Sequence, residues 1–160
     1  MKRAVKTLHY WDSCVFLALL KNESDKIDEC LSVISAAMSG QLLIVTSTLT
    51  FIEVIKLKKG EPKLGREVEE KIRGFFKHEW IITRELDRSV AETARELIWN
   101  NNLHPKDSAH VATALKSKVD LLDTFDNELI KLSGTIGDPP LIIQRPHILN
   151  QQLNLPIYSD

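Results

Sequence analysis

Short apolar segments alternate with longer amphipathic ones along this 160-residue chain, and this alternation constrains its fold more than any other feature. The short segments are typical of strands, and they cover residues 7–11, 42–46, 80–83, 121–124 and 141–143. In the stretches between them, apolar residues recur at helical spacing, which predicts helices over 13–21, 24–40, 50–58, 64–77, 87–99, 105–115 and 127–132. Strands that alternate with helices favour a parallel sheet covered on both faces. We therefore expect an α/β fold, a three-layer α/β/α sandwich with a central, mainly parallel sheet of four to five short strands.

Length and composition narrow the class of protein further. We expect a single domain over 1–160, with a core of about 7–149 and a tail over 150–160. A hydrophobic content of 43% and a net charge of -1 exclude bulk disorder and a strongly basic protein that coats nucleic acid, but not local binding of nucleic acid. The apolar run 15–20 is too short to span a bilayer, and two cysteines are too few for a disulfide scaffold. We expect a cytoplasmic protein that does not associate with membranes.

Four carboxylates lie where a predicted strand passes into a helix or in the first turns of a helix: Asp12, Glu53, Asp107 and Asp126. In an open α/β sheet, such positions gather at the carboxyl edge of the strands, where ligands bind. Carboxylates gathered there repel one another unless a positive charge neutralises them. Mg²⁺ and Mn²⁺ prefer oxygen ligands and would supply that charge.

Each of these acids also has a purely structural interpretation. Asp12 and Asp126 could cap the helices that follow them. Glu53 stands three residues after Thr50, which is the spacing of a capping box, and Asp107 lies in a first turn, where the helix dipole favours an acid. Four acids at four successive junctions favour a shared site, but the residues alone leave both interpretations open.

Several segments resemble the motifs of the PIN-domain nucleases, in the same order along the chain. They are 11–17 (WDSCVFL), 46–54 (TSTLTFIEV), 105–114 (PKDSAHVATA), 121–126 (LLDTFD) and 141–149 (LIIQRPHIL). The segment 105–114 is the most specific of them. Each motif is short, and their order and placement on the predicted elements carry the resemblance.

The resemblance implies an Mg²⁺- or Mn²⁺-dependent endoribonuclease that hydrolyses single-stranded RNA, with VapC-type toxins of toxin–antitoxin pairs among its relatives. Its acidic quartet would be Asp12, Glu53, Asp107 and Asp126, with Asp12, Asp107 and Asp126 at the metal and Glu53 orienting water. The hydroxyls of Ser13 and Thr124 would support them. The implied partners are RNA, a cognate antitoxin and a second copy of the chain. The alternative is a non-catalytic PIN-like module that binds RNA or regulates another protein.

Positive charge near the acids would be needed to bind RNA. Residues 56–77 contain eight basic and four acidic side chains, an excess that the whole chain lacks. We identify Lys56, Lys58, Lys59 and Lys106 as candidates for contact with RNA phosphates. From residue 64 onward, we favour a solvated helix face with Glu–Lys pairs.

The remaining polar and aromatic residues receive structural interpretations. Asp123 could be a fifth acid of the site or an outward-facing strand residue, and we favour the second. His104 and His110 flank Asp107 and are interpreted as packed or surface residues rather than metal ligands. The three tryptophans, which are Trp11, Trp80 and Trp99, are expected in the core.

Overall fold

A computed structural model describes residues 5–55, 60, 62 and 65–148 of the chain. Its sheet has five parallel strands in the order β3-β2-β1-β4-β5, which confirms the predicted parallel sheet. The strands are β1 (Thr7–Trp11), β2 (Leu42–Ser47), β3 (Ile81–Arg84), β4 (Leu121–Asp123) and β5 (Ile142–Gln144).

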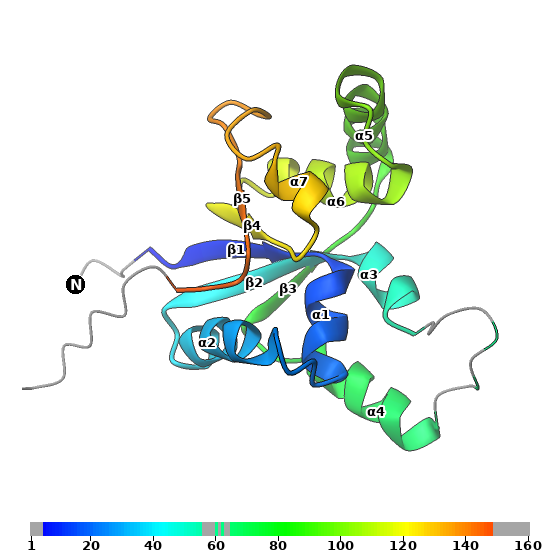
Figure 1. The fold of residues 1–160 in the computed structure, drawn as a ribbon, viewed down its shortest axis with the longest axis vertical. Helices are drawn as coiled ribbons and strands as arrows, with labels where there is room; N and C mark the ends of the chain where they lie inside the picture. The colour runs from blue at the N-terminus through cyan, green and yellow to red at the C-terminus, as the bar shows by residue number, and fades with distance from the viewer. Residues whose placement is uncertain (1–4, 56–59, 61, 63–64, 149–160) are drawn as a thin grey trace, which may run out of the picture.

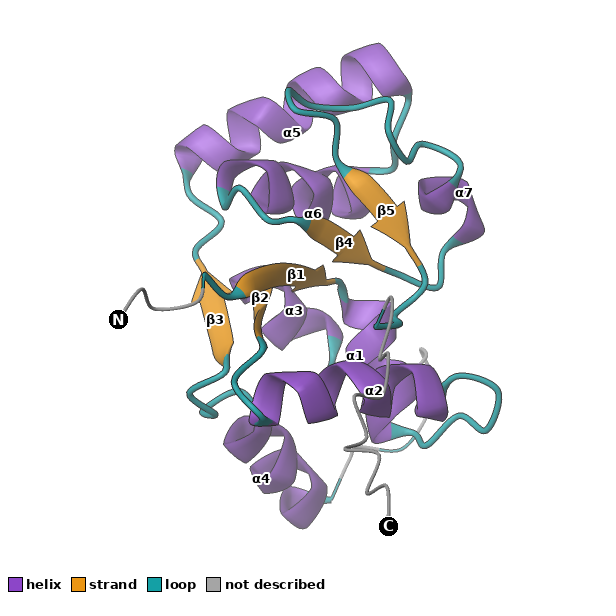
Figure 2. Cartoon of the chain, turned by 90° about the vertical axis from the view of Figure 1, so that its left-hand side faces the viewer, coloured by secondary structure: helices purple, strands orange, loops and turns teal. Residues whose placement is uncertain are grey.

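Helices cover both faces of this sheet. They are α1 (Ser13–Leu20), α2 (Ile27–Met38), α3 (Thr48–Glu53), α4 (Arg66–Phe75), α5 (Arg88–Asn101), α6 (Pro105–Lys116) and α7 (Asn127–Ile130). Figures 1 and 2 show α1, α2 and α4 on one side of the sheet and α5, α6 and α7 on the other. The three-layer α/β/α sandwich expected from the sequence is therefore confirmed.

The central strand β1 divides the core into two halves, because successive strand residues point to opposite faces. Trp11 is fully buried and packs edge-on against Phe16 of α1, in the half that lies under α1 and α2. Tyr10 is fully buried on the other face, in the same cluster as Val111 of α6 and Leu122 of β4. Adjacent residues of β1 therefore reach two different helical layers.

Helix α3 begins two residues earlier than the sequence predicted. The hydroxyl of Ser47 caps it by accepting a hydrogen bond from the backbone N–H of Leu49 at 3.1 Å. Thr50 lies inside the helix, where its buried hydroxyl is 2.8 Å from that of Thr46. The capping-box interpretation of Thr50 and Glu53 is therefore wrong, because the sequence offers several hydroxyls here and the earlier one takes the cap.

Two further expectations about helices are wrong. The helix predicted from residue 24 begins at Ile27 instead, after Lys26, whose side chain makes no capping hydrogen bond. Trp99 does not enter the core, since 89% of it is exposed on α5. The inward face of that helix is formed by Val90, Ala94 and Leu97, whose spacing leaves Trp99 on the solvent side.

The described part of the basic stretch, α4, matches the expected solvated helix. Lys71 pairs with Glu67 and Arg73 pairs with Glu69, each one helical turn apart. Ile72 is the residue that α4 buries. Within the residues that the model describes, no helix is both long and apolar enough to cross a membrane.

Candidate active site

The order of the strands creates a switch point between β1 and β4. The chain runs from β1 outward through β2 to β3, then returns to place β4 on the other side of β1. Ligands of open α/β sheets bind at the carboxyl ends of the strands that flank such a point. Asp12 directly follows β1, and Thr124 and Asp126 follow β4, so the fold brings these three residues to that position.

Asp12 is a buried carboxylate, 5% exposed, and both of its oxygens accept hydrogen bonds. Oδ2 accepts from the Thr124 hydroxyl at 2.6 Å, and Oδ1 accepts from the Cys14 thiol at 2.8 Å and the Val15 N–H at 3.3 Å. Burial raises the pKa of Asp12, although the hydrogen bonds from Cys14 and Thr124 oppose the shift. Asp12 therefore caps α1 and also lies at the switch point, so the two interpretations of this residue are compatible.

Asp107 and Asp126 bring further negative charge toward Asp12. Burial raises the pKa of Asp107, and the charges of Asp126 and Asp12 act in the same direction, while His104 opposes them. Asp126 caps α7 by accepting the N–H of Glu128 at 2.8 Å. The three aspartates thus come from three different junctions, and the charges of Asp12 and Asp126 reach Asp107.

Glu53 reaches the same region from the last residue of α3. Its Oε2 lies 2.9 Å from Nε2 of His110, and its Oε1 lies 4.0 Å from Nζ of Lys106. Burial alone would raise the pKa of Glu53, but hydrogen bonds from His110 and Ser13 and the charge of Lys106 outweigh it, so the pKa is lowered. Glu53 is therefore held as a carboxylate, and Ser13 and Lys106 lie beside it as candidate site residues.

The structure describes one of the four lysines that were identified as candidates for contact with RNA. The side chain of Lys106 is 65% exposed, so its ammonium faces solvent next to Glu53. Lys56, Lys58 and Lys59 lie outside the described residues.

The chemistry of this donor set fits a hard divalent cation. The four side chains offer carboxylate oxygens. Burial and then the negative charges of Asp126 and Asp12 raise the pKa of Asp107, and a cation would neutralise those charges. Within the described residues, no three His, Cys, Asp or Glu side chains stand close enough to form a ready metal-binding group. Proteins commonly hold Mg²⁺ with one or two carboxylates and several waters, so a closed cluster of protein ligands is not required.

Sequence analysis missed the roles of His110 and Cys14 in this arrangement. His110 is buried on α6, and its Nδ1 lies 2.7 Å from the hydroxyl of Tyr10. It stands three residues after Asp107, which places both side chains on one face of the helix, and this spacing could have indicated a shared site. The thiol of Cys14 also belongs to this arrangement, since it donates a hydrogen bond to Asp12 and lies 3.4 Å from the Thr124 hydroxyl.

Asp123 is neither an outward-facing residue nor a member of the acidic group. It is fully buried, and its Oδ2 accepts a hydrogen bond from Nε1 of Trp11 at 2.8 Å and lies 3.0 Å from Nδ1 of His9. The register pairs Asp123 with Trp11, so it points to the same face as Trp11, under the α1–α2 layer. The neighbouring strand β1 thus provides both polar contacts of Oδ2, whereas Oδ1 is buried without a hydrogen-bond partner among the described residues.

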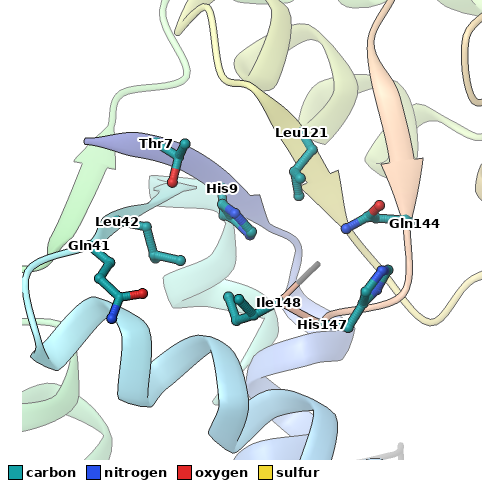
Figure 3. A pocket seen from close by; sticks show the side chains of 8 residues that line it. All are labelled: Thr7, His9, Gln41, Leu42, Leu121, Gln144, His147 and Ile148. Atoms are coloured by element: carbon teal, nitrogen blue, oxygen red, sulfur yellow. The ribbon is translucent and has the colours of Figure 1, made fainter. Parts of the chain in front are cut away.

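A pocket on this face of the sheet lies apart from the four acids. Figure 3 shows His9 of β1 projecting into it opposite Gln144 and His147. The residues that line it are Thr7, His9, Gln41, Leu42, Leu121, Gln144, His147 and Ile148. None of the four candidate catalytic acids is among them.

Solved structures with the same fold come from several bacteria. A toxin–antitoxin complex from Klebsiella pneumoniae matches with a TM-score of 0.58 and 16% identity, over 88% of this chain and 99% of that chain. VapBC2 from Rickettsia felis bound to a promoter DNA fragment gives a TM-score of 0.61 and 14% identity, over 87% of this chain and 98% of that chain. VapC20 from Mycobacterium tuberculosis, a toxin that cleaves the sarcin–ricin loop, gives a TM-score of 0.59 and 14% identity, over 75% of this chain and 91% of that chain. At these identities, the similarity establishes the fold.

No curated protein is similar enough in sequence to count as a match. The family model of the PIN domain, however, matches residues 10–134. This match runs from the end of β1 through β4 to beyond α7, includes all four candidate acids, and covers most of the chain. The chain therefore belongs to the PIN-domain family.

Proposed function

We propose that this protein is a metal-dependent endoribonuclease that hydrolyses phosphodiester bonds of single-stranded RNA. The observation that carries the proposal is the match to the PIN-domain family over residues 10–134, which include all four candidate acids. Burial, together with the charges of Asp126 and Asp12, raises the pKa of Asp107. Carboxylates that repel one another in this way are suited to hold a cation.

In this proposal, Asp12, Asp107 and Asp126 hold Mg²⁺ or Mn²⁺. A divalent ion at these residues supplies Lewis acidity toward the phosphodiester and toward water. Thr124 keeps Asp12 oriented through its 2.6 Å hydrogen bond, and Ser13 supports Glu53. His110 holds Glu53 through Oε2, and Oε1, which lies 4.0 Å from Nζ of Lys106, would orient the attacking water.

Positive charge for the RNA backbone would come from Lys106 beside Glu53. We also retain Lys56, Lys58 and Lys59, which follow α3 in the sequence, as proposed phosphate contacts. Cleavage of this type leaves a 5′-phosphate and a 3′-hydroxyl.

We propose further that the protein acts in the cytoplasm as the toxin of a toxin–antitoxin pair, with a cognate antitoxin and a second copy of the chain as partners. Two of the solved structures that share its fold are toxin–antitoxin complexes, and a third is a toxin that cleaves RNA of the sarcin–ricin loop. Their fold supports this assignment, and co-purification with the product of a neighbouring reading frame would test it.

The enzymatic proposal is tested by incubating the protein with single-stranded RNA and Mn²⁺, with and without a chelator. We expect cleavage that requires the metal, products with 5′-phosphates, and loss of cleavage in Asp12→Asn and Asp107→Asn. Asp28→Asn is the matched control, because it removes the same charge from an exposed position on α2.

Wild-type cleavage rates in the Asp12→Asn and Asp107→Asn variants would contradict this proposal. RNA binding without cleavage, together with no measurable affinity for Mn²⁺, would favour the non-catalytic PIN-like module instead. Isothermal titration calorimetry with Mn²⁺ separates these two outcomes.

A further inference from the structure

Three side chains from different elements form a buried hydrogen-bonded series that ends at the acidic edge. The hydroxyl of Tyr10 on β1 lies 2.7 Å from Nδ1 of His110 on α6. Nε2 of the same imidazole lies 2.9 Å from Oε2 of Glu53 on α3. Tyr10 and His110 are 0% and 2% exposed, so water does not compete for either bond.

The chemistry of the two ends determines the direction of these bonds. A carboxylate accepts hydrogen bonds and donates none, so the hydrogen between His110 and Glu53 must reside on Nε2. In a neutral imidazole, the other nitrogen is then an acceptor, and Nδ1 needs a donor. Tyr10 supplies it, because its hydroxyl lies 2.7 Å from Nδ1 and a phenol carries its proton at neutral pH.

We propose that Tyr10 and His110 are positioning residues for Glu53: Tyr10 fixes the imidazole tautomer, and His110 then holds Oε2 of Glu53 so that Oε1 is left to orient water. The inference rests on the proposed function, in which Glu53 performs that task. His110 thus acts on Glu53 as well as filling space in the core.

The placement of Glu53 explains why such a contact is needed. Glu53 is the last residue of a six-residue helix, so the helix alone holds its side chain weakly. Helix α6 is twice as long, with 12 residues, and carries Asp107 in its first turn. Through His110, the same helix that positions Asp107 also positions Glu53, which couples two acids that lie far apart in the sequence.

Variants at His110 test this role, because they distinguish the loss of the hydrogen-bond donor from a change in side-chain packing. His110→Leu removes the donor, and His110→Gln keeps an amide N–H that can reach Glu53. We expect kcat for RNA cleavage to fall about 10- to 100-fold in His110→Leu with KM little changed, and to be largely restored in His110→Gln. Tyr10→Phe should give a smaller fall in kcat, and His78→Gln, a substitution of an exposed histidine, should have no effect.

The tautomer gives a readout that does not depend on activity. In the metal-free wild-type protein at neutral pH, ¹⁵N NMR should show the proton of His110 on Nε2, and Tyr10→Phe should weaken this preference. A proton on Nδ1, a charged imidazolium, or equal cleavage by His110→Leu and wild type would overturn the proposal. If the wild-type protein cleaves no RNA at all, the proposed function fails, and the NMR measurement still decides whether Tyr10 sets the tautomer. Should His110→Leu fail to fold, His110→Gln and Tyr10→Phe still provide the test.

Discussion

The hydroxyl of Thr124 donates a hydrogen bond to Oδ2 of Asp12 at 2.6 Å and thereby connects the carboxyl ends of β4 and β1. The same oxygen of Thr124 accepts the backbone N–H of Asp126 at 3.0 Å. One hydroxyl therefore orients two of the proposed metal ligands. Residues that orient a ligand in this way commonly affect metal affinity or activity about 10- to 100-fold when they are replaced.

We expect Thr124→Val to lower Mn²⁺ affinity or RNA cleavage by about 10- to 100-fold. The variant should also lose about 1–3 kcal/mol of unfolding free energy, because a buried carboxylate loses a donor. Thr124→Ser keeps the hydroxyl and is the matched control. Calorimetry with Mn²⁺, chemical denaturation and cleavage rates check the three effects, and a Thr124→Val protein that matches Thr124→Ser in all of them would contradict this role.

Lys106 is expected to contact RNA rather than to stabilise the fold. Its side chain is 65% exposed, and its ammonium lies 4.0 Å from Glu53, too exposed for this pair to contribute much stability. Lys106→Gln should weaken RNA binding and reduce the slope of log K against log salt by about 0.7, the value for one phosphate contact with a single strand. Fluorescence anisotropy across a salt series measures both quantities.

The control for this measurement is Lys116→Gln, which changes the same charge at the exposed end of the same helix. An unchanged salt slope in Lys106→Gln, or an equal change in Lys116→Gln, would show that Lys106 is not a specific phosphate contact.

The fold and the placement of the acids followed from the sequence because both depend on local pattern. Strand–helix alternation predicted the parallel sheet, and a residue that follows a parallel strand must lie at its carboxyl edge. Asp12 and Asp126 were located in this way, and both also cap the next helix, as their positions after a strand suggested.

Pairings between distant segments could not be predicted in the same way. The contact of His110 with Glu53 joins residues 57 positions apart, and that of Asp123 with Trp11 joins residues 112 apart. Both depend on strand order and register, which local pattern does not specify. The exposure of Trp99 was missed for a different reason: residue type suggested burial, whereas the phase of the α5 helix decides which face it occupies.

The two cysteines should be unreactive in the folded protein. Burial raises the pKa of the Cys14 thiol, with the charge of Asp12 and the hydrogen bond to it acting in the same direction. Burial also raises the pKa of Cys30, to about 12. Because the thiolate is the reactive species, a thiol reagent at mildly alkaline pH should modify both residues far more slowly in the native protein than in urea.

A Cys30→Ala variant isolates the reaction of Cys14. The reaction rate is measured from the coloured thiolate that an aromatic disulfide reagent releases when the thiol attacks it. Fast native-state modification of that variant would mean that the Cys14 thiol is not held against Asp12 as described.

The buried carboxyl of Asp123 predicts a pH-dependent contribution to stability with a definite sign. Burial raises its pKa above the ordinary value of 3.8, and the hydrogen bonds from His9 and Trp11 only partly oppose the shift. A group whose pKa is higher in the folded state stabilises the fold most below its unfolded pKa, and this stabilisation is lost as the pH rises through the folded pKa. Asp123→Asn removes the titrating group while keeping an oxygen that accepts from Trp11.

We therefore expect the Tm of wild type, measured relative to Asp123→Asn, to fall as the pH is raised from about 3 to about 7. Thermal denaturation followed by circular dichroism across this range gives the difference directly. Asp28→Asn should show no such trend, because Asp28 is exposed. The opposite result, in which wild type gains stability over Asp123→Asn as the pH rises, would contradict this prediction. It would mean that the attraction between Asp123 and His9 outweighs the cost of burying the carboxylate charge, so that the two residues form a stabilising ion pair.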